Sequence, residues 1–158
     1  MKQKVSPDQL SALQFSRVWV REAVFVDDES SQDAITPQDI KEVGITLEVK
    51  LAFSENRDRA MVTLRASLEP PASQRYFVKL SAAVEGAFTV ASGSDPQLLE
   101  RFASLQAPVI LLPYLRQVFS ELTAQSRIGA LVLPPLNMAE VMQAMQAKME
   151  KSQASANP

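Results

Sequence analysis

The chain has 158 residues, 46% of them hydrophobic, and a formal net charge of −2, which suffices for one domain with a sizeable core. It contains no Cys and no His, which excludes disulfides, thiolate nucleophiles, His bases and zinc sites built from these ligands. Its four glycines are not clustered and its basic residues form no stripe, so we expect no cofactor, no metal and no nucleic-acid partner.

We expect no export signal in the N-terminal region. Residues 1–16 include lysines but no continuous apolar segment, and the densest apolar run, at 107–115, is far shorter than the ~20 residues that a membrane span needs. We therefore expect a soluble, cytoplasmic protein without a membrane partner.

An irregular strand is the first predicted element, at residues 15–26. One face would carry Phe15, Trp19 and Phe25 with Arg17 and Arg21, and the other Val18, Val20, Val24 and Val26. Both faces would then be partly covered. A second copy of the chain could cover one of them, or the strand could be central, with a helix on one face and aliphatic Arg stems on the other.

A 17-residue acidic connection, 27–43, precedes three regular strands. Apolar and polar residues alternate in 44–54, the polar segment 54–59 predicts a turn, and alternation resumes in 62–68, which predicts a hairpin. Pro70-Pro71 ends this strand, and a further alternating segment covers 76–90.

The pattern changes to helix after Gly93. Residues 94–97, Ser-Asp-Pro-Gln, predict a helix start with Ser94 and Gln97 in a capping box. The helix should break or kink at Pro108 and Pro113 and end at Gly129. Apolar residues surround most of the helix between these prolines, so it must be buried on nearly all sides. One four-stranded sheet covers a single side, which predicts self-association.

A final helix is predicted after an extended apolar linker at 130–136, with Asn137 as its cap. Its apolar stripe consists of Met138, Val141, Met142, Met145 and Met149. Such a stripe either packs on the core or forms an adaptable apolar binding surface, since Met is flexible and polarisable.

Carboxylates are the remaining candidates for acid–base chemistry. Glu48, Glu69 and Glu85 all fall on the outward positions of their strands, where a solvated charge is the ordinary explanation. We therefore expect no active site and no enzyme.

Three segments carry a family pattern. Residues 108–116 form an apolar run ending in Pro-Tyr-x-Arg, residues 86–90 contain Gly-x-Phe, and residues 134–137 read Pro-Pro-Leu-Asn. With the order of four strands, broken helix, linker and terminal helix, they resemble the SecB family of export chaperones, over about residues 15–149. The first segment is similar to the family's first-helix signature and is the most specific of the three.

This resemblance implies an α+β fold, with a four-stranded antiparallel Greek-key sheet followed by a long broken helix and a C-terminal helix. It implies a single domain over residues 1–158, with 1–14 and 151–158 flexible. It also implies a homotetramer, assembled as a dimer of dimers, that holds non-native polypeptide clients without ATP in apolar grooves.

The resemblance assigns candidate site residues. The client groove would comprise Ile45, Leu47, Val49, Met138, Val141, Met142 and Met145, to which we add Ile35, Ile40 and Val43 by position. We expect the interface between subunits to include Val18, Trp19, Val20, Ile110, Leu111, Tyr114, Leu115 and Val118. Export members dock the motor SecA through acidic residues on the outer sheet face, and Glu22 matches one such position, whereas the others are Val26, Lys79 and Ser81.

The client itself has two candidates. The short stretch from Gly129 to Pro134 is similar to that of SecB-like chaperones that protect the antitoxin of a toxin–antitoxin pair, which favours an antitoxin client. The alternative is general export, with preproteins delivered to SecA. A carrier of small apolar ligands is a third hypothesis, of another class.

Overall fold

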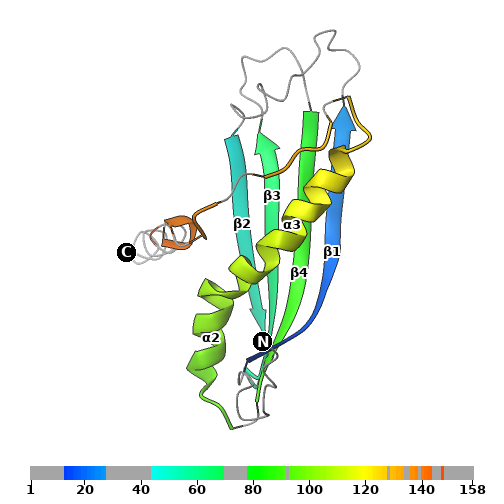
Figure 1. The fold of residues 1–158 in the computed structure, drawn as a ribbon. Coiled ribbons are helices and arrows are strands. Elements are labelled where there is room, and N and C mark those ends of the chain that lie inside the picture. Colours follow the sequence, from blue (N-terminus) through cyan, green and yellow to red (C-terminus); the bar gives the residue numbers. More distant parts are fainter. Residues whose placement is uncertain are drawn as a thin grey trace, which may run out of the picture.

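Four antiparallel strands form one sheet in the computed structural model, which describes residues 13–27, 44–69, 78–91, 93–127, 129–133, 136–138, 140–143 and 147. The strands are β1 (Leu13–Asp27), β2 (Gly44–Phe53), β3 (Arg59–Glu69) and β4 (Val78–Val90), in the order β1-β4-β3-β2. The meander β2-β3-β4 with β1 returned beside β4 is a Greek key, as expected. Helices lie on one face of this sheet (Figure 1).

The hairpin between β2 and β3 is confirmed, with Gly44 opposite Glu69 and Phe53 opposite Ala60. Its turn is closed by the Ser54 amide, which donates to the Arg59 carbonyl at 3.0 Å. Arg57 provides the left-handed residue, at φ 53°. β3 ends directly before Pro70, because proline cannot donate to a ladder.

The predicted faces of β1 were wrong, because the strand contains two irregularities, between Phe15 and Arg17 and between Val20 and Glu22. Each bulge shifts the alternation by one residue. Phe15 therefore stacks on Phe88 under the helices, whereas Trp19 lies on the opposite face beneath the Arg17 guanidinium. β1 is an edge strand of this sheet, so the alternative of a central strand was also wrong.

Two helices, α2 (Pro96–Leu105) and α3 (Ala107–Thr123), follow β4. The helix start was predicted correctly but its cap was not, because the Asp95 carboxylate, rather than Ser94, accepts from the Gln97 amide at 2.9 Å. The predicted break occurs at Gln106, just before Pro108. Pro113 does not break α3, since it lies on the exposed side, where water can satisfy the carbonyl that loses its partner.

The end of α3 lies at Thr123, six residues before the predicted stop at Gly129. The buried Thr123 hydroxyl donates to the Phe119 carbonyl at 2.8 Å and accepts from the Leu131 amide at 2.7 Å. Beyond it, the Arg127 guanidinium pairs with the Asp27 carboxylate at the end of β1. These contacts return the chain to the sheet after α3.

The hydrophobic core lies between the sheet and α2/α3. Its largest fully buried side chains include Phe88, Phe119, Leu64, Leu80, Leu99, Leu111, Leu115 and Leu133. The segment after α3 crosses the helix-bearing face and leads to a short C-terminal helix, of which Met138, residues 140–143 and Ala147 are described (Figure 1). Helix and linker therefore occur where the sequence predicted them.

Candidate functional site

The apolar row of β2 is the sheet surface that the helices cover least. Ile45, Leu47 and Val49, here called the β2 inner row, alternate toward the helix-bearing face and are half-buried. α3 runs diagonally across the sheet, from α2 toward β1, and packs on β3, β4 and β1 (Figure 1). Because β2 forms the edge farthest from β1, its inner row extends past α3.

The C-terminal segment also packs on the hydrophobic core. Leu133, Met138 and Met142 are buried and belong to the same hydrophobic cluster that the β2 inner row packs against. The structure thus brings the strand and final-helix residues of the predicted groove into one cluster. Val141 is half-buried, whereas Ile35, Ile40, Val43 and Met145 lie outside the described residues.

The described methionines of the last helix face this subunit's own core. Met138 and Met142 are nearly inaccessible, so in this conformation their side chains are not exposed to a client. Met138 and Met142 therefore pack on the core, whereas Met145 and Met149 lie outside the described residues.

Apolar side chains also remain exposed along the two helices. Leu98 and Leu105 on α2, and Val109 and Tyr114 on α3, are all exposed. Half-buried Phe102 and Ile110 lie between them in the sequence. These exposed apolar side chains make the two helices a candidate interaction surface.

The residues predicted for a subunit interface fall into three groups according to their burial. Leu111 and Leu115 are fully buried inside the subunit, so these two side chains have no surface with which to contact a second copy. Val20 and Tyr114 are exposed. The remaining four, Val18, Trp19, Ile110 and Val118, are half-buried.

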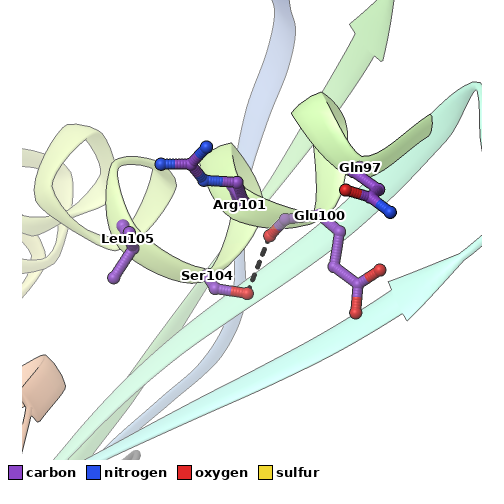
Figure 2. Close-up of a pocket in the computed structure, with 5 residues that line it drawn as sticks. All are labelled: Gln97, Glu100, Arg101, Ser104 and Leu105. Atoms are coloured by element: carbon purple, nitrogen blue, oxygen red, sulfur yellow. Dashed lines mark hydrogen bonds between the residues drawn. The ribbon is translucent and has the colours of Figure 1, made fainter. Parts of the chain in front are cut away.

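A shallow hollow of ≈ 330 Å³ lies along α2 (Figure 2). Its lining residues are Gln97, Glu100, Arg101, Ser104 and Leu105. Ser104 uses its hydroxyl to donate to the Glu100 carbonyl at 2.7 Å, which is an ordinary contact within a helix. All five residues come from one helix and do not converge on a point, so we assign no function to this hollow.

Glu85 corrects a further prediction, since it is buried rather than solvated. It lies on β4, a central strand, where Arg21 Nη1 contacts its carboxylate at 2.6 Å and the Thr63 hydroxyl donates to it at 3.1 Å. Sequence alternation placed Glu85 correctly on the outer face. It could not show that β1 and β3 flank β4 and bring Arg21 and Thr63 over it.

Glu22, the candidate docking residue for SecA, is engaged within the subunit. Its carboxylate contacts Arg65 Nη2 at 2.7 Å and accepts from the Ser81 hydroxyl at 2.9 Å. Glu48, on the same face, is exposed and lies 3.4 Å from Lys50 Nζ. The side chain of Glu69 lies outside the described residues.

Metal centres and membrane-spanning helices are two further classes of site, considered for the part of the chain that the structure describes. No group of three or more acidic, His or Cys side chains there could hold a metal ion. No described helix combines the length and hydropathy that a membrane crossing requires.

The amino-acid sequence is similar to a known protein family. A family model described as preprotein translocase subunit SecB matches residues 6–149. An uncharacterized protein of Methanocaldococcus jannaschii is 27% identical over 134 residues, 83% of each chain. The protein-export protein SecB of Alcanivorax borkumensis is 26% identical over 95 residues, 60% of each chain.

A solved structure shares the fold. The SecB-like chaperone of Mycobacterium tuberculosis, in complex with a ChAD peptide from an antitoxin, superposes with a TM-score of 0.57 at 16% sequence identity. The match covers 79% of this chain and 91% of that chain.

Proposed function

The chain belongs to the SecB family of chaperones, and we propose that it holds non-native polypeptide against the β2 inner row without using a nucleotide. The observation that carries this proposal is the position of Ile45, Leu47 and Val49. They line the helix-bearing face of an edge strand and remain only half-buried within the subunit. An unfolded segment would complete their burial.

An edge strand suits an extended client for a second reason. β2 pairs with β3 along one edge, and no described strand pairs with its other edge. Backbone groups at such an edge can hydrogen-bond an added strand, while the inner row contacts its apolar side chains. This combination accepts many sequences, because the backbone is common to all of them.

Holding a client requires no chemistry. Burying ~1,000 Å² of apolar area contributes on the order of 25 kcal/mol before costs, at ~25 cal/mol per Å². Ordering of the client and loss of its rigid-body freedom offset most of this free energy. Net affinity therefore stays modest, so that the client can be released.

The proposal includes a homotetramer built as a dimer of dimers. The exposed apolar residues Val109 and Tyr114 on α3, and Val20 on β1, support it, since they lie outside the subunit's core. Self-association would bury them.

The client we favour is an antitoxin. The structural neighbour bound to an antitoxin peptide supports this choice, and so does the short connection from Gly129 to Pro134. The relative named as a protein-export protein keeps preprotein export as the second candidate. The Glu22 carboxylate already contacts Arg65 and Ser81, which favours the antitoxin client, because docking to SecA through Glu22 would compete with these contacts.

Suppression of client aggregation tests the proposal. We expect Leu47→Thr with Val49→Thr to abolish protection of an unfolded client, measured by light scattering, without changing the oligomer. The matched control, Thr46→Ser with Ala52→Ser, changes exposed positions on the opposite face of the same strand and should protect fully. Full protection by the Leu47/Val49 variant would refute the proposed surface.

Co-purification separates the two clients. The polypeptide that remains bound to the purified chaperone is identified by mass spectrometry. An antitoxin encoded beside the chaperone gene supports the dedicated role, whereas a mixture of preproteins supports general export.

A further inference from the structure

The outer face of the sheet, opposite α2 and α3, carries a second surface. It consists of the side chains that alternate away from the core on all four strands, and no described helix packs on it (Figure 1). A hollow of ≈ 410 Å³ lies in this face. Its lining comprises Arg21, Glu48, Lys50, Ala52, Met61, Thr63, Arg65 and Glu85.

The charge of this face is opposite in sign to that of the whole chain. Its described basic side chains are Arg17, Arg21, Lys50, Arg59, Arg65 and Lys79, and its described acidic side chains are Glu22, Glu48 and Glu85. Among the side chains of this face that the structure describes, six cations against three anions leave an excess of three positive charges. The complete sequence has a net charge of −2, so positive charge is concentrated here.

The cations also reach farther into solvent than the anions. The Arg21 side chain is 61% exposed against 8% for its partner Glu85, and Lys50 is 68% exposed against 48% for Glu48. The pair of Arg65 and Glu22 follows the same order. In these three pairs the guanidinium and ammonium groups are therefore more accessible than their carboxylates, although Glu48 is itself exposed.

We propose that the outer face docks a net-acidic segment of a partner protein, with one apolar side chain of that segment seated in the hollow. Ala52 and Met61 supply the apolar lining of the hollow. Arg21, Lys50 and Arg65 surround it and would pair with acidic residues on either side of the apolar anchor. This surface is on the opposite side of the sheet from the β2 inner row, so client and partner could bind together.

Charge arrangement disfavours two other occupants. Nucleic acid requires a continuous cationic track along its phosphates, whereas here exposed Glu48 interrupts the cations. A second copy using the same face in a two-fold contact would oppose like charges. An acidic polypeptide can place its own cations against Glu48 and its anions elsewhere.

The test uses the full chain and a fluorescent peptide of alternating Glu and Ser with one central Leu. Fluorescence anisotropy should report binding that weakens with added salt, and Lys50→Glu with Lys79→Glu should weaken it by at least about tenfold. Arg101→Glu, at an exposed position of α2 outside this face, should leave the affinity unchanged. The neutral variant Lys50→Gln with Lys79→Gln should show an intermediate loss of peptide affinity. It replaces the charge-reversal variant in the test if that variant fails to fold.

Three comparisons decide the result. Lys in place of Glu in the peptide should abolish binding, and Ser in place of its Leu should weaken binding. An oligothymidine of equal charge that binds as tightly as the acidic peptide would overturn the proposal in favour of nucleic acid. Absence of peptide binding, or an equal loss in Arg101→Glu, would also overturn it. Protection of an unfolded client should be unchanged in the Lys50/Lys79 variants, so this result is independent of the client-binding proposal.

Discussion

Gly86 on β4 lies directly beneath Leu111 on α3, so that a Cβ added to Gly86 would lie 2.7 Å from Leu111 Cδ2. The same Cβ would lie 2.9 Å from the Phe88 ring and 3.3 Å from the Phe15 ring. Leu111 and Phe88 are fully buried. The absence of a side chain at Gly86 is therefore what allows α3 to approach the sheet.

Gly86→Ala should destabilise the fold by about 1–3 kcal/mol, because the buried neighbours must leave their rotamers to accommodate the methyl group. Urea denaturation measures the decrease in the free energy of unfolding. Gly44→Ala is the control, since a Cβ there meets nothing within 4 Å. Combining Gly86→Ala with Leu111→Val, which removes the clashing methyl group, should cost less than the sum of the two changes.

Leu133→Ala should cost about 2–4 kcal/mol, because Leu133 is a fully buried anchor of the segment after α3. Its neighbour Val132 is 59% exposed, and Val132→Ala should change stability by less than about 0.5 kcal/mol. Limited proteolysis should detect release of the C-terminal segment in the Leu133 variant alone. Equal effects of the two changes would contradict the packing of this segment on the core.

Thr123→Val should destabilise by about 1–3 kcal/mol, because it removes the acceptor of the Leu131 amide and leaves that donor unsatisfied. Hydrogen exchange at Leu131 should accelerate. Ser104→Ala removes an exposed hydroxyl bond within α2 and should be nearly neutral. Unchanged exchange at Leu131 would show that the hydroxyl does not hold the linker.

Arg21→Ala should destabilise more than Glu85→Gln, although both remove the same ion pair. Without Arg21, the buried Glu85 carboxylate keeps only the Thr63 hydroxyl as a described partner, at a cost of about 1–3 kcal/mol. Without the Glu85 charge, the exposed Arg21 side chain is solvated by water. Thermal unfolding of both variants measures the difference in stability. A larger destabilisation by Glu85→Gln than by Arg21→Ala would contradict the prediction.

Tyr114→Ala should weaken self-association by at least about tenfold, because Tyr114 is an exposed aromatic residue on α3 and aromatic anchors dominate interfaces. Sedimentation at decreasing concentration should show smaller species. Gln97→Ala, at an exposed polar position of α2, is the control and should leave self-association unchanged. A monomeric wild-type protein would remove the basis of this prediction and of the tetramer.

The strands could be predicted because period-two alternation is a local signal. The hairpin of β2 and β3 needed only the alternating residues and the polar turn from Ser54 to Arg59, and its bounds agree closely with the structure. The β2 inner row was likewise predicted from alternation. Its position beyond α3 depends on the path of that helix across the sheet, which no local pattern encodes.

Contacts between distant segments account for the errors. The faces of β1 were wrong because its bulges depend on pairing with β4, and Glu85 was placed in solvent because its partners come from other strands. Gly129 was a local stop signal, yet α3 ends earlier, at the buried Thr123, whose hydroxyl accepts a hydrogen bond from the Leu131 amide.

Taken alone, the order of residues determined which segments become strands and helices, because backbone sterics and hydrophobic spacing act over a few neighbours. It also placed the apolar rows on their elements and carried the family pattern. The tertiary structure decided which rows stay exposed and which charges are buried. Solvent is excluded only where elements distant in the chain pack together, and that packing leaves the β2 inner row half-buried at one edge and concentrates cations on the outer face.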